Sequence, residues 1–252
     1  MAQIQANGAN LYYEVHGVGP ATIVFAHGKG GNHLSWWHQV AHFSQRYRCI
    51  TFDHRSYGLS TNSTDGRNQE AYVDDLTAIL DHVGVSSAYL VGQSMGGRTC
   101  LDFAIAYPDR VHALLLASTI AGVVDPELQE ILKVHANPPK DLLARVLSRG
   151  FREQNAALTQ LFASIEALNH VGKDPFPLLI KGAGREAVAK CNTRTLLIVG
   201  DEDLVAPPPA VEWLANQLPN ALLKGIPNTG HSIYFERPAT FNEILDQFLS
   251  TR

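Results

Sequence analysis

Cysteine is scarce in this chain of 252 residues, which contains three, Cys49, Cys100 and Cys191, far apart from one another. An odd number without regular spacing excludes a disulfide framework and is typical of proteins in a reducing compartment. None of the three is next to a histidine, and their spacing does not match that of a metal site. We expect all three to be small packing residues in the core.

Long apolar runs are also missing. No stretch reaches the roughly 18 apolar residues that a membrane span requires, and the longest, around residues 111–116, has the length of a buried strand. The first five residues lack the basic start and apolar segment of a secretory signal. We therefore expect a cytoplasmic protein with no membrane partner.

Neither sign of charge dominates. Lys and Arg number 20 and Asp and Glu 24, which gives a formal net charge of -4, and no run of like charges occurs. Such a balance does not attract nucleic acid. Hydrophobic residues make up 45% of the chain, enough for a sizeable core. We expect a monomer or homodimer, built as one large domain or one domain with an insertion, that acts on a small molecule.

Short β-rich runs alternate with helical patterns over much of the chain. Expected strands lie at 11–15, 22–26, 49–52, 88–91, 111–117, 195–199 and 221–223, and helices at 34–47, around 74–83, before Tyr107, after Pro209 and around 241–248. The run at 22–26 is nearly all apolar, as in strands that are covered on both faces. This alternation predicts an α/β fold with a mostly parallel central sheet and helices on both faces.

One expected helix has a clear apolar face. Its apolar side chains recur with helical spacing at Leu76, Ile79, Leu80 and Val83. Three acidic side chains are expected on the opposite, solvent-facing side: Asp74, Asp75 and Asp81.

Residues 119–190 interrupt the alternation, because this segment has helical patterns, several prolines and no convincing strand. We expect an all-helical cap at 119–190, inserted into a core domain formed by 1–118 and 191–252. The apolar stripe in the cap consists of Leu158, Leu161, Phe162, Ile165 and Leu168.

The segment Gly92-Gln93-Ser94-Met95-Gly96 matches G-x-S-x-G between an expected strand and an expected helix. A serine hydroxyl is hardly ionised near neutral pH, so as a nucleophile it needs a neighbouring base and an exposed position. A sharp strand-to-helix turn lifts Ser94 above the sheet edge, and glycine two residues before and after it avoids a Cβ clash. The alternative, a serine that only caps a helix, does not require this pattern.

The chain resembles the α/β-hydrolase family in this turn and in four further segments. They are His27-Gly28-Lys29-Gly30 (oxyanion loop), residues 53–60 (the D-x-R-G-x-G-x-S loop), Gly200-Asp201-Glu202-Asp203 with Pro207 (acid turn), and Gly230-His231 (histidine loop). Ser56 departs from the pattern, because a glycine is usual there, and this leaves the local loop conformation open. The resemblance covers most of the chain and implies that nucleophile, acid and histidine follow in that order.

This order implies that Ser94 is the nucleophile and His231 the base, since His231 is the only histidine near the end of the chain. The resemblance places the acid at Asp203, three residues after Gly200 and four before a proline. Asp201 is the runner-up. Asp125 is a remoter substitute, and its alternative role is to cap the helix that Pro126 begins.

By resemblance, the backbone N–H groups of Lys29 and Met95 form the oxyanion hole. The Lys29 side chain has two interpretations: it favours substrates that carry a carboxylate, or it points away into solvent. His27 is expected to hold its own loop by hydrogen bonds.

Substrate-pocket candidates are Trp36, Trp37, Leu161 and Phe162. The alternative for Trp36 and Trp37 is packing in the core, with one of them facing the pocket. His38 and His42 are four residues apart, but no Asp, Glu or Cys nearby completes a ligand set, so we expect no metal. No cofactor is expected.

These residues predict a hydrolase that cleaves a small carboxylic ester or lactone through a Ser-Asp-His triad and an acyl-enzyme. Carbon–carbon bond hydrolysis and thioester hydrolysis remain alternatives on the same fold. An alternative of another class is a small-molecule receptor that keeps the triad, which turnover of model esters would distinguish from an enzyme.

Overall fold

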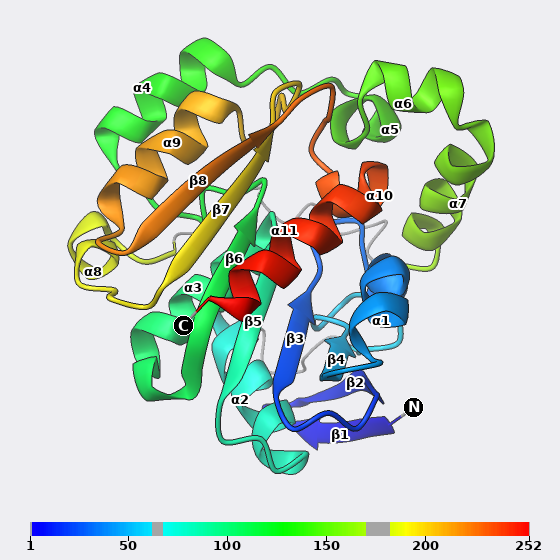
Figure 1. Cartoon of the computed structure of the whole chain (residues 1–252), viewed down its shortest axis with the longest axis vertical. Coiled ribbons are helices and arrows are strands. Elements are labelled where there is room, and N and C mark those ends of the chain that lie inside the picture. Colours follow the sequence, from blue (N-terminus) through cyan, green and yellow to red (C-terminus); the bar gives the residue numbers. More distant parts are fainter. Residues whose placement is uncertain (1, 62–67, 170–181, 252) are drawn as a thin grey trace.

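A computed structural model of the protein describes residues 2–61, 68–169 and 182–251. At its centre lies an eight-stranded sheet in the order β1-β2-β4-β3-β5-β6-β7-β8 (Figure 1). β2 runs antiparallel to β1 and β4, and the remaining pairs are parallel. The strands are β1 (Ala2–Ala6), β2 (Ala9–His16), β3 (Thr22–Ala26), β4 (Arg48–Phe52), β5 (Ala88–Gln93), β6 (Val111–Ala117), β7 (Thr195–Gly200) and β8 (Ala221–Ile226).

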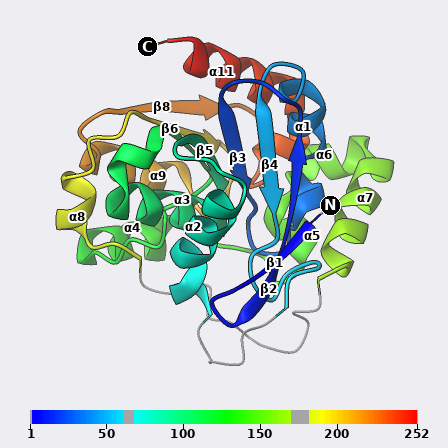
Figure 2. The same cartoon turned by 90° about the horizontal axis from the view of Figure 1, so that it is seen from below.

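Helices cover both faces of the sheet, as predicted, and Figure 2 shows α2 and α11 on opposite sides of it. They are α1 (Trp37–Phe43), α2 (Tyr72–His82), α3 (Met95–Ala106), α4 (Pro126–His135), α5 (Leu142–Val146), α6 (Arg149–Gln154), α7 (Ala156–Ala167), α8 (Arg185–Ala189), α9 (Pro208–Gln217), α10 (Ile233–Glu236) and α11 (Pro238–Ser250), with short 3-10 turns η1 (His33–Trp36), η2 (Gln69–Ala71) and η3 (Pro108–Arg110). Within the described ranges, no helix is long and apolar enough to cross a membrane.

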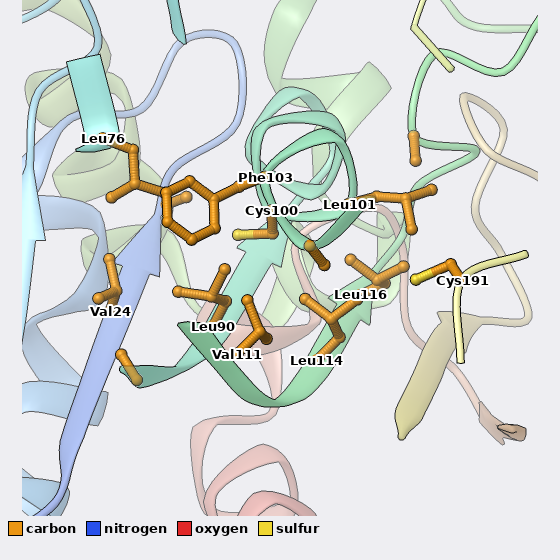
Figure 3. Packing of buried hydrophobic residues seen from close by; sticks show 14 of the residues in the cluster. Val24, Leu76, Leu90, Cys100, Leu101, Phe103, Val111, Leu114, Leu116 and Cys191 are labelled. Atoms are coloured by element: carbon orange, nitrogen blue, oxygen red, sulfur yellow. The ribbon is translucent and has the colours of Figure 1, made fainter. Parts of the chain in front are cut away.

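The core has two parts, one on each side of the sheet, because successive side chains of a strand point to opposite faces. On one side, Leu90 and Leu114 of the sheet pack with Phe103 of α3 (Figure 3). On the other side, the next residues along the same strands, Val91 and Leu115, belong to a second cluster that includes aromatic side chains of η1 and α11. The continuous apolar runs of the central strands are therefore explained by burial on both faces.

Two local features differ from the sequence-based expectation. β1 was not expected; it forms a hairpin with β2 through Asn7-Gly8, which have φ values of +49° and +76°. An Asn-Gly pair is a hairpin signal, because both positions require positive φ. The helix expected at 34–47 consists of η1 followed by α1, which ends at Phe43.

The expected solvent-facing position of Asp75 is wrong. Asp75 is buried, and its carboxylate accepts hydrogen bonds from Nε and Nη2 of Arg55 at 2.7 and 2.6 Å. Helical spacing places Asp75 beside the apolar face, and a charged partner from the 53–60 loop compensates its burial. The ion pair therefore connects this loop to α2.

The segment between β6 and β7 contains α4 to α8, and no strand is found in its described residues. These helices do not form one block: α4 and α8 contact α9, whereas α7 contacts η1 (Figure 1). Pro175 and Pro177 lie outside the described residues. That the segment acts as a cap with boundaries at 119 and 190 stays a prediction.

Candidate active site

Ser94 occupies a strained turn between β5 and α3. Its φ is +52°, a value that residues with a side chain rarely adopt. The two flanking glycines are required, because a Cβ on Gly92 would lie 2.5 Å from the carbonyl oxygen of Gly96, and a Cβ on Gly96 would lie 2.1 Å from that of Ala26. The G-x-S-x-G spacing thus has the steric cause that the sequence suggests, and α3 begins at the residue after Ser94.

Neighbouring strand β6 holds this turn in place. The Ser94 backbone N–H donates to the carbonyl of Ala117 at 3.0 Å, and the Thr119 hydroxyl donates to the carbonyl of Ser94 at 2.7 Å. Such hydrogen bonds over-determine the unfavourable backbone conformation, which is the condition under which strain of this kind persists.

The carboxylate of Asp203 lies against the imidazole of His231. Nδ1 of His231 is 2.8 Å from Oδ2 and 3.0 Å from Oδ1 of Asp203, and both side chains are buried. Backbone N–H groups of Val205 and Ala206 also donate to Oδ1 at 2.9 Å. Because an ionised carboxylate only accepts hydrogen bonds, the proton lies on Nδ1, which leaves Nε2 of His231 with the lone pair that a base needs.

The two alternative acids have other partners. Asp201 is exposed, and its Oδ1 accepts the backbone N–H of Thr229 at 3.3 Å. Asp125 caps α4, where it accepts the N–H groups of Glu127 and Leu128. Of the three candidates, the structure brings Asp203 to the histidine, whereas Asp125 has the capping role that the sequence offers as its alternative.

Three contacts hold the histidine loop near the acid turn and near Ser94. A Cβ on Gly200 would lie 2.2 Å from the carbonyl oxygen of Thr229, so this glycine allows the two loops to touch. Gln93 donates from Nε2 to the carbonyl of His231 at 3.1 Å. Glu236 accepts the N–H of Gly230 at 3.1 Å. Gln93, the residue before Ser94, is therefore hydrogen-bonded directly to His231, the residue proposed as the base.

The loop at 27–30 approaches Ser94 closely. A Cβ on Gly28 would lie 2.0 Å from the Gln93 side-chain oxygen and 3.1 Å from the Ser94 Cβ. Lys29 follows directly, and Met95 starts α3, where N–H groups of the first turn have no carbonyl partner within the helix. Both residues line the same cavity as Ser94, and that their backbone N–H groups form an oxyanion hole stays a prediction.

A buried chain of hydrogen bonds connects the loop at 27–30 to α3. Nδ1 of His27 donates to the Gly28 carbonyl at 2.8 Å, so Nε2 accepts from the backbone and ring N–H groups of His54, at 3.0 and 3.1 Å. Nε2 of His54 then accepts from the Thr99 hydroxyl at 2.9 Å. Burial lowers the pKa of His27 to about 4 and that of His54 well below its usual value. Both rings are therefore neutral, and they join the loop to α3.

A cavity of about 370 Å³ adjoins these groups, within the size range of small-molecule sites. Ser94, Met95, Lys29 and His231 line it, together with residues from the loop after β6, from α4 and from the turn at 205–206. That α4 forms part of the wall was not predicted, because helical periodicity does not reveal which elements a helix meets.

None of the four predicted pocket residues lines this cavity. Trp36 is fully buried and packs against Phe25, Tyr234 and Phe241, as in the packing alternative. Trp37 is 39% exposed and stacks on His38. Phe162 packs edge-on against Phe235, whereas Leu161 is 38% exposed. That these four residues contact a substrate stays a prediction, although Phe162 itself packs on Phe235 of α10.

Within the part of the chain that the structure describes, no group of three or more His, Cys, Asp and Glu side chains is arranged to hold a metal ion. Nε2 of His42 instead bonds to Asp246 at 2.6 Å. The three cysteines are buried, as expected.

Comparison with known proteins gives consistent results. The sequence profile of the alpha/beta hydrolase fold matches residues 21–238. RutD of Caulobacter sp. strain K31 is named as a carbamate hydrolase, an activity that its name marks as unproven. The two sequences are 28% identical over an alignment of 271 positions, which covers 95% of this chain and 96% of RutD.

Two solved structures superpose on nearly the whole chain. Est816, described as an N-acyl homoserine lactone degrading enzyme, has a TM-score of 0.80 and 27% identity, with 98% of this chain and 100% of Est816 covered. An esterase from Thermogutta terrifontis has a TM-score of 0.84, with 99% and 98% covered; at 22% identity this likeness concerns the fold alone.

Proposed function

The chain belongs to the α/β hydrolase fold family, and on this premise we propose that it is a serine hydrolase that cleaves small carboxylic esters or lactones. The observation that carries the proposal is the 2.8 Å contact between Nδ1 of His231 and Asp203, made by a histidine that lines one cavity with Ser94. In this arrangement a carboxylate orients an imidazole that shares a cavity with a half-buried serine, as a serine nucleophile and its base require.

The proposed reaction has two halves. Ser94 Oγ attacks the carbonyl carbon, its proton passes to Nε2 of His231, and the Asp203 carboxylate stabilises the imidazolium that forms. The backbone N–H groups of Met95 and Lys29 bind the oxyanion. As the tetrahedral intermediate collapses, His231 returns the proton to the leaving alkoxide. Water then attacks the acyl-enzyme by the same route and releases the acid, with no cofactor in either half.

The names of the similar proteins support attack on a carbonyl carbon. Est816 is described as a lactone-degrading enzyme, and RutD is named, without proof of the activity, as a carbamate hydrolase. Both reactions cleave a bond to a carbonyl carbon. The backbone donors described above bind an oxyanion whatever group leaves. Thioesters and carbon–carbon bonds next to a ketone are therefore included among the substrates to be assayed.

The test compares wild type, Ser94→Ala and Ser164→Ala with p-nitrophenyl esters, lactones, a thioester and a carbamate. Ser164 lies on α7, and among the described residues its hydrogen bonds stay within that helix, so Ser164→Ala should retain the wild-type rate. Wild type should turn over many times, and Ser94→Ala should be slower by at least about 10³-fold. A fluorophosphonate probe should add its mass to wild type and not to Ser94→Ala.

Equal rates for Ser94→Ala and wild type would show that Ser94 is not the nucleophile. A single stoichiometric burst without turnover would instead favour the receptor alternative.

A further inference from the structure

Among the described residues, the Lys and Arg residues in the largely apolar wall of the cavity beside Ser94 have no acidic counterpart there. Lys29, Arg98 and Lys133 contribute to its wall, and among the described residues no Asp or Glu does. Composition does not explain this bias, because the chain has more acidic than basic residues, 24 against 20. A wall with one sign of charge favours ligands of the opposite sign.

The three cations differ in their surroundings. Lys29 is exposed, and the Lys133 side chain is 68% exposed and pairs with Glu130 at 2.5 Å. Exposed charges such as these are screened by water and salt. The Arg98 side chain is only 10% exposed. A charge at that depth acts in a lower dielectric, so it contributes most to the selection of a ligand.

Among the described residues, protein acceptors take up only some of the N–H donors of the Arg98 guanidinium. Nε donates to Asp102 at 3.2 Å, and Nη1 donates to the side-chain oxygen of Gln69 at 3.0 Å. The Asp102 carboxylate also accepts the N–H of Ala183 at 3.1 Å. A guanidinium has five N–H donors, and Nη2 of Arg98 donates to no residue in the described ranges. Donors remain for a ligand in the cavity that Arg98 lines.

Arg98 also has a fixed spacing from the nucleophile. It lies on α3, four residues after Ser94, which is about one helical turn or about 6 Å along the helix axis. Ser94 itself precedes the helix, but both Ser94 and Arg98 line the same cavity. A small ligand can therefore contact both Ser94 and Arg98.

We propose that Arg98 binds a carboxylate of the substrate, and that the natural substrates are esters or lactones that carry such an acidic group a few carbons from the scissile carbonyl. This inference rests on the proposed function. Arg98 would be a specificity-determining residue: it positions the substrate by a charge-assisted hydrogen bond and takes no part in bond cleavage. Lys29 and Lys133 would attract the anion at the more exposed part of the wall.

The test uses two matched series of substrates, the monomethyl esters of succinate, glutarate and adipate, and the same esters with a primary amide in place of the free carboxylate. In the wild-type protein, kcat/KM should be higher for the esters with a free carboxylate than for the matching amides. The ratio of acid to amide should fall by about ten- to a hundredfold in Arg98→Met, as expected when a hydrogen bond to a charged group is lost. Arg98→Lys should retain an intermediate ratio.

Two further variants serve as controls. Lys190→Met removes an exposed lysine that pairs with Glu186, and it should leave the ratio at the wild-type value. Arg98→Met combined with Asp102→Asn avoids leaving an unpaired buried carboxylate, so the ratio can be measured even if Arg98→Met alone does not fold.

Binding separates this inference from the proposed function. Glutarate should bind to Ser94→Ala by calorimetry, and glutaramide should bind at least about tenfold more weakly. Glutarate binding should be lost in Ser94→Ala with Arg98→Met. If wild type hydrolyses both series and Arg98→Met leaves the ratio unchanged, the carboxylate site is wrong and the hydrolase stands. If glutarate binds through Arg98 but no substrate is turned over, the hydrolase is wrong and the anion site stands.

Discussion

The Glu236 carboxylate accepts a 2.5 Å hydrogen bond from the hydroxyl of Ser148, a residue 88 positions earlier in the chain. The same carboxylate accepts the backbone N–H of Ser148 at 3.2 Å and that of Gly230 at 3.1 Å. Ser148 caps α6, and Gly230 directly precedes the proposed base. One buried acid therefore joins the segment between β6 and β7 to the histidine loop.

Replacing Glu236 by Ala should remove the acceptor of three buried donors. We expect the free energy of unfolding to fall by about 3 kcal/mol, and turnover to fall because the histidine loop loses its support. Urea denaturation and ester assays would measure both effects. Glu243→Ala, at an exposed position of the adjoining helix α11, should change stability little. Equal effects of the two substitutions would contradict this role of Glu236.

The choice between the two acids after β7 can be tested by substituting each with Asn. Asp203→Asn should lower kcat by about 10³–10⁴-fold, because the amide no longer favours the required tautomer and charge of the imidazole. Asp201→Asn should lower it by less than about tenfold, since an amide oxygen can still accept the N–H of Thr229. A larger loss for Asp201→Asn would transfer the role of acid to that residue.

The buried histidines should make the fold sensitive to acid. His27 has a folded-state pKa of about 4, below the usual 6.5, so the unfolded chain binds more protons between these values. Stability is therefore full above about pH 6.5 and is lost as the pH falls toward 4. For His27 alone the loss should reach about 2 kcal/mol by about pH 5.

Urea denaturation at several pH values would measure this slope. It should be shallower in His27→Asn, and unchanged in His112→Asn, at an exposed position of β6. A stability that does not vary over this range would contradict the proposed neutral pair.

Ser56 is the residue that departs from the family pattern, and it adopts the conformation that the usual glycine would favour. Its φ is +70°, and among the described residues its buried hydroxyl has no hydrogen-bond partner. Ser56→Gly should raise the free energy of unfolding by about 1 kcal/mol. Ser56→Ala, which removes the hydroxyl but keeps the strain, should gain less. A thermal or urea melt in which Ser56→Gly loses stability would show that the loop prefers serine.

Features that depend on local sequence were predictable. Apolar runs identified the central strands, and the glycines around Ser94 identified its turn, because strand burial and steric crowding act over a few residues. The acid and histidine turns were found by family resemblance, and the structure brings Asp203 and His231 together. Their distance from each other in the chain does not matter, since they follow β7 and β8, which are adjacent and parallel in the sheet.

Features that depend on which elements meet were not predictable. The apolar stripe of α7 shows that one face is buried, but it does not tell whether that face meets the cavity or α10. Asp75 has an acidic side chain at the border of a helix face, and only the distant Arg55 makes its burial favourable. In the sequence Arg98 is an ordinary helix residue. Its contact with Gln69 and its place in the cavity wall become visible only in the structure.

The three buried cysteine thiols can be used to follow the unfolding of each side of the sheet. Cys49 belongs to the cluster on the α11 side of the sheet, and Cys100 and Cys191 belong to the cluster on the opposite side. Burial raises the pKa of Cys49 to about 12 and also raises that of Cys100, so these two residues offer little thiolate to an alkylating reagent in the native protein. Pulse alkylation at increasing urea, followed by mass spectrometry, would therefore record separately when each side of the sheet is exposed to solvent.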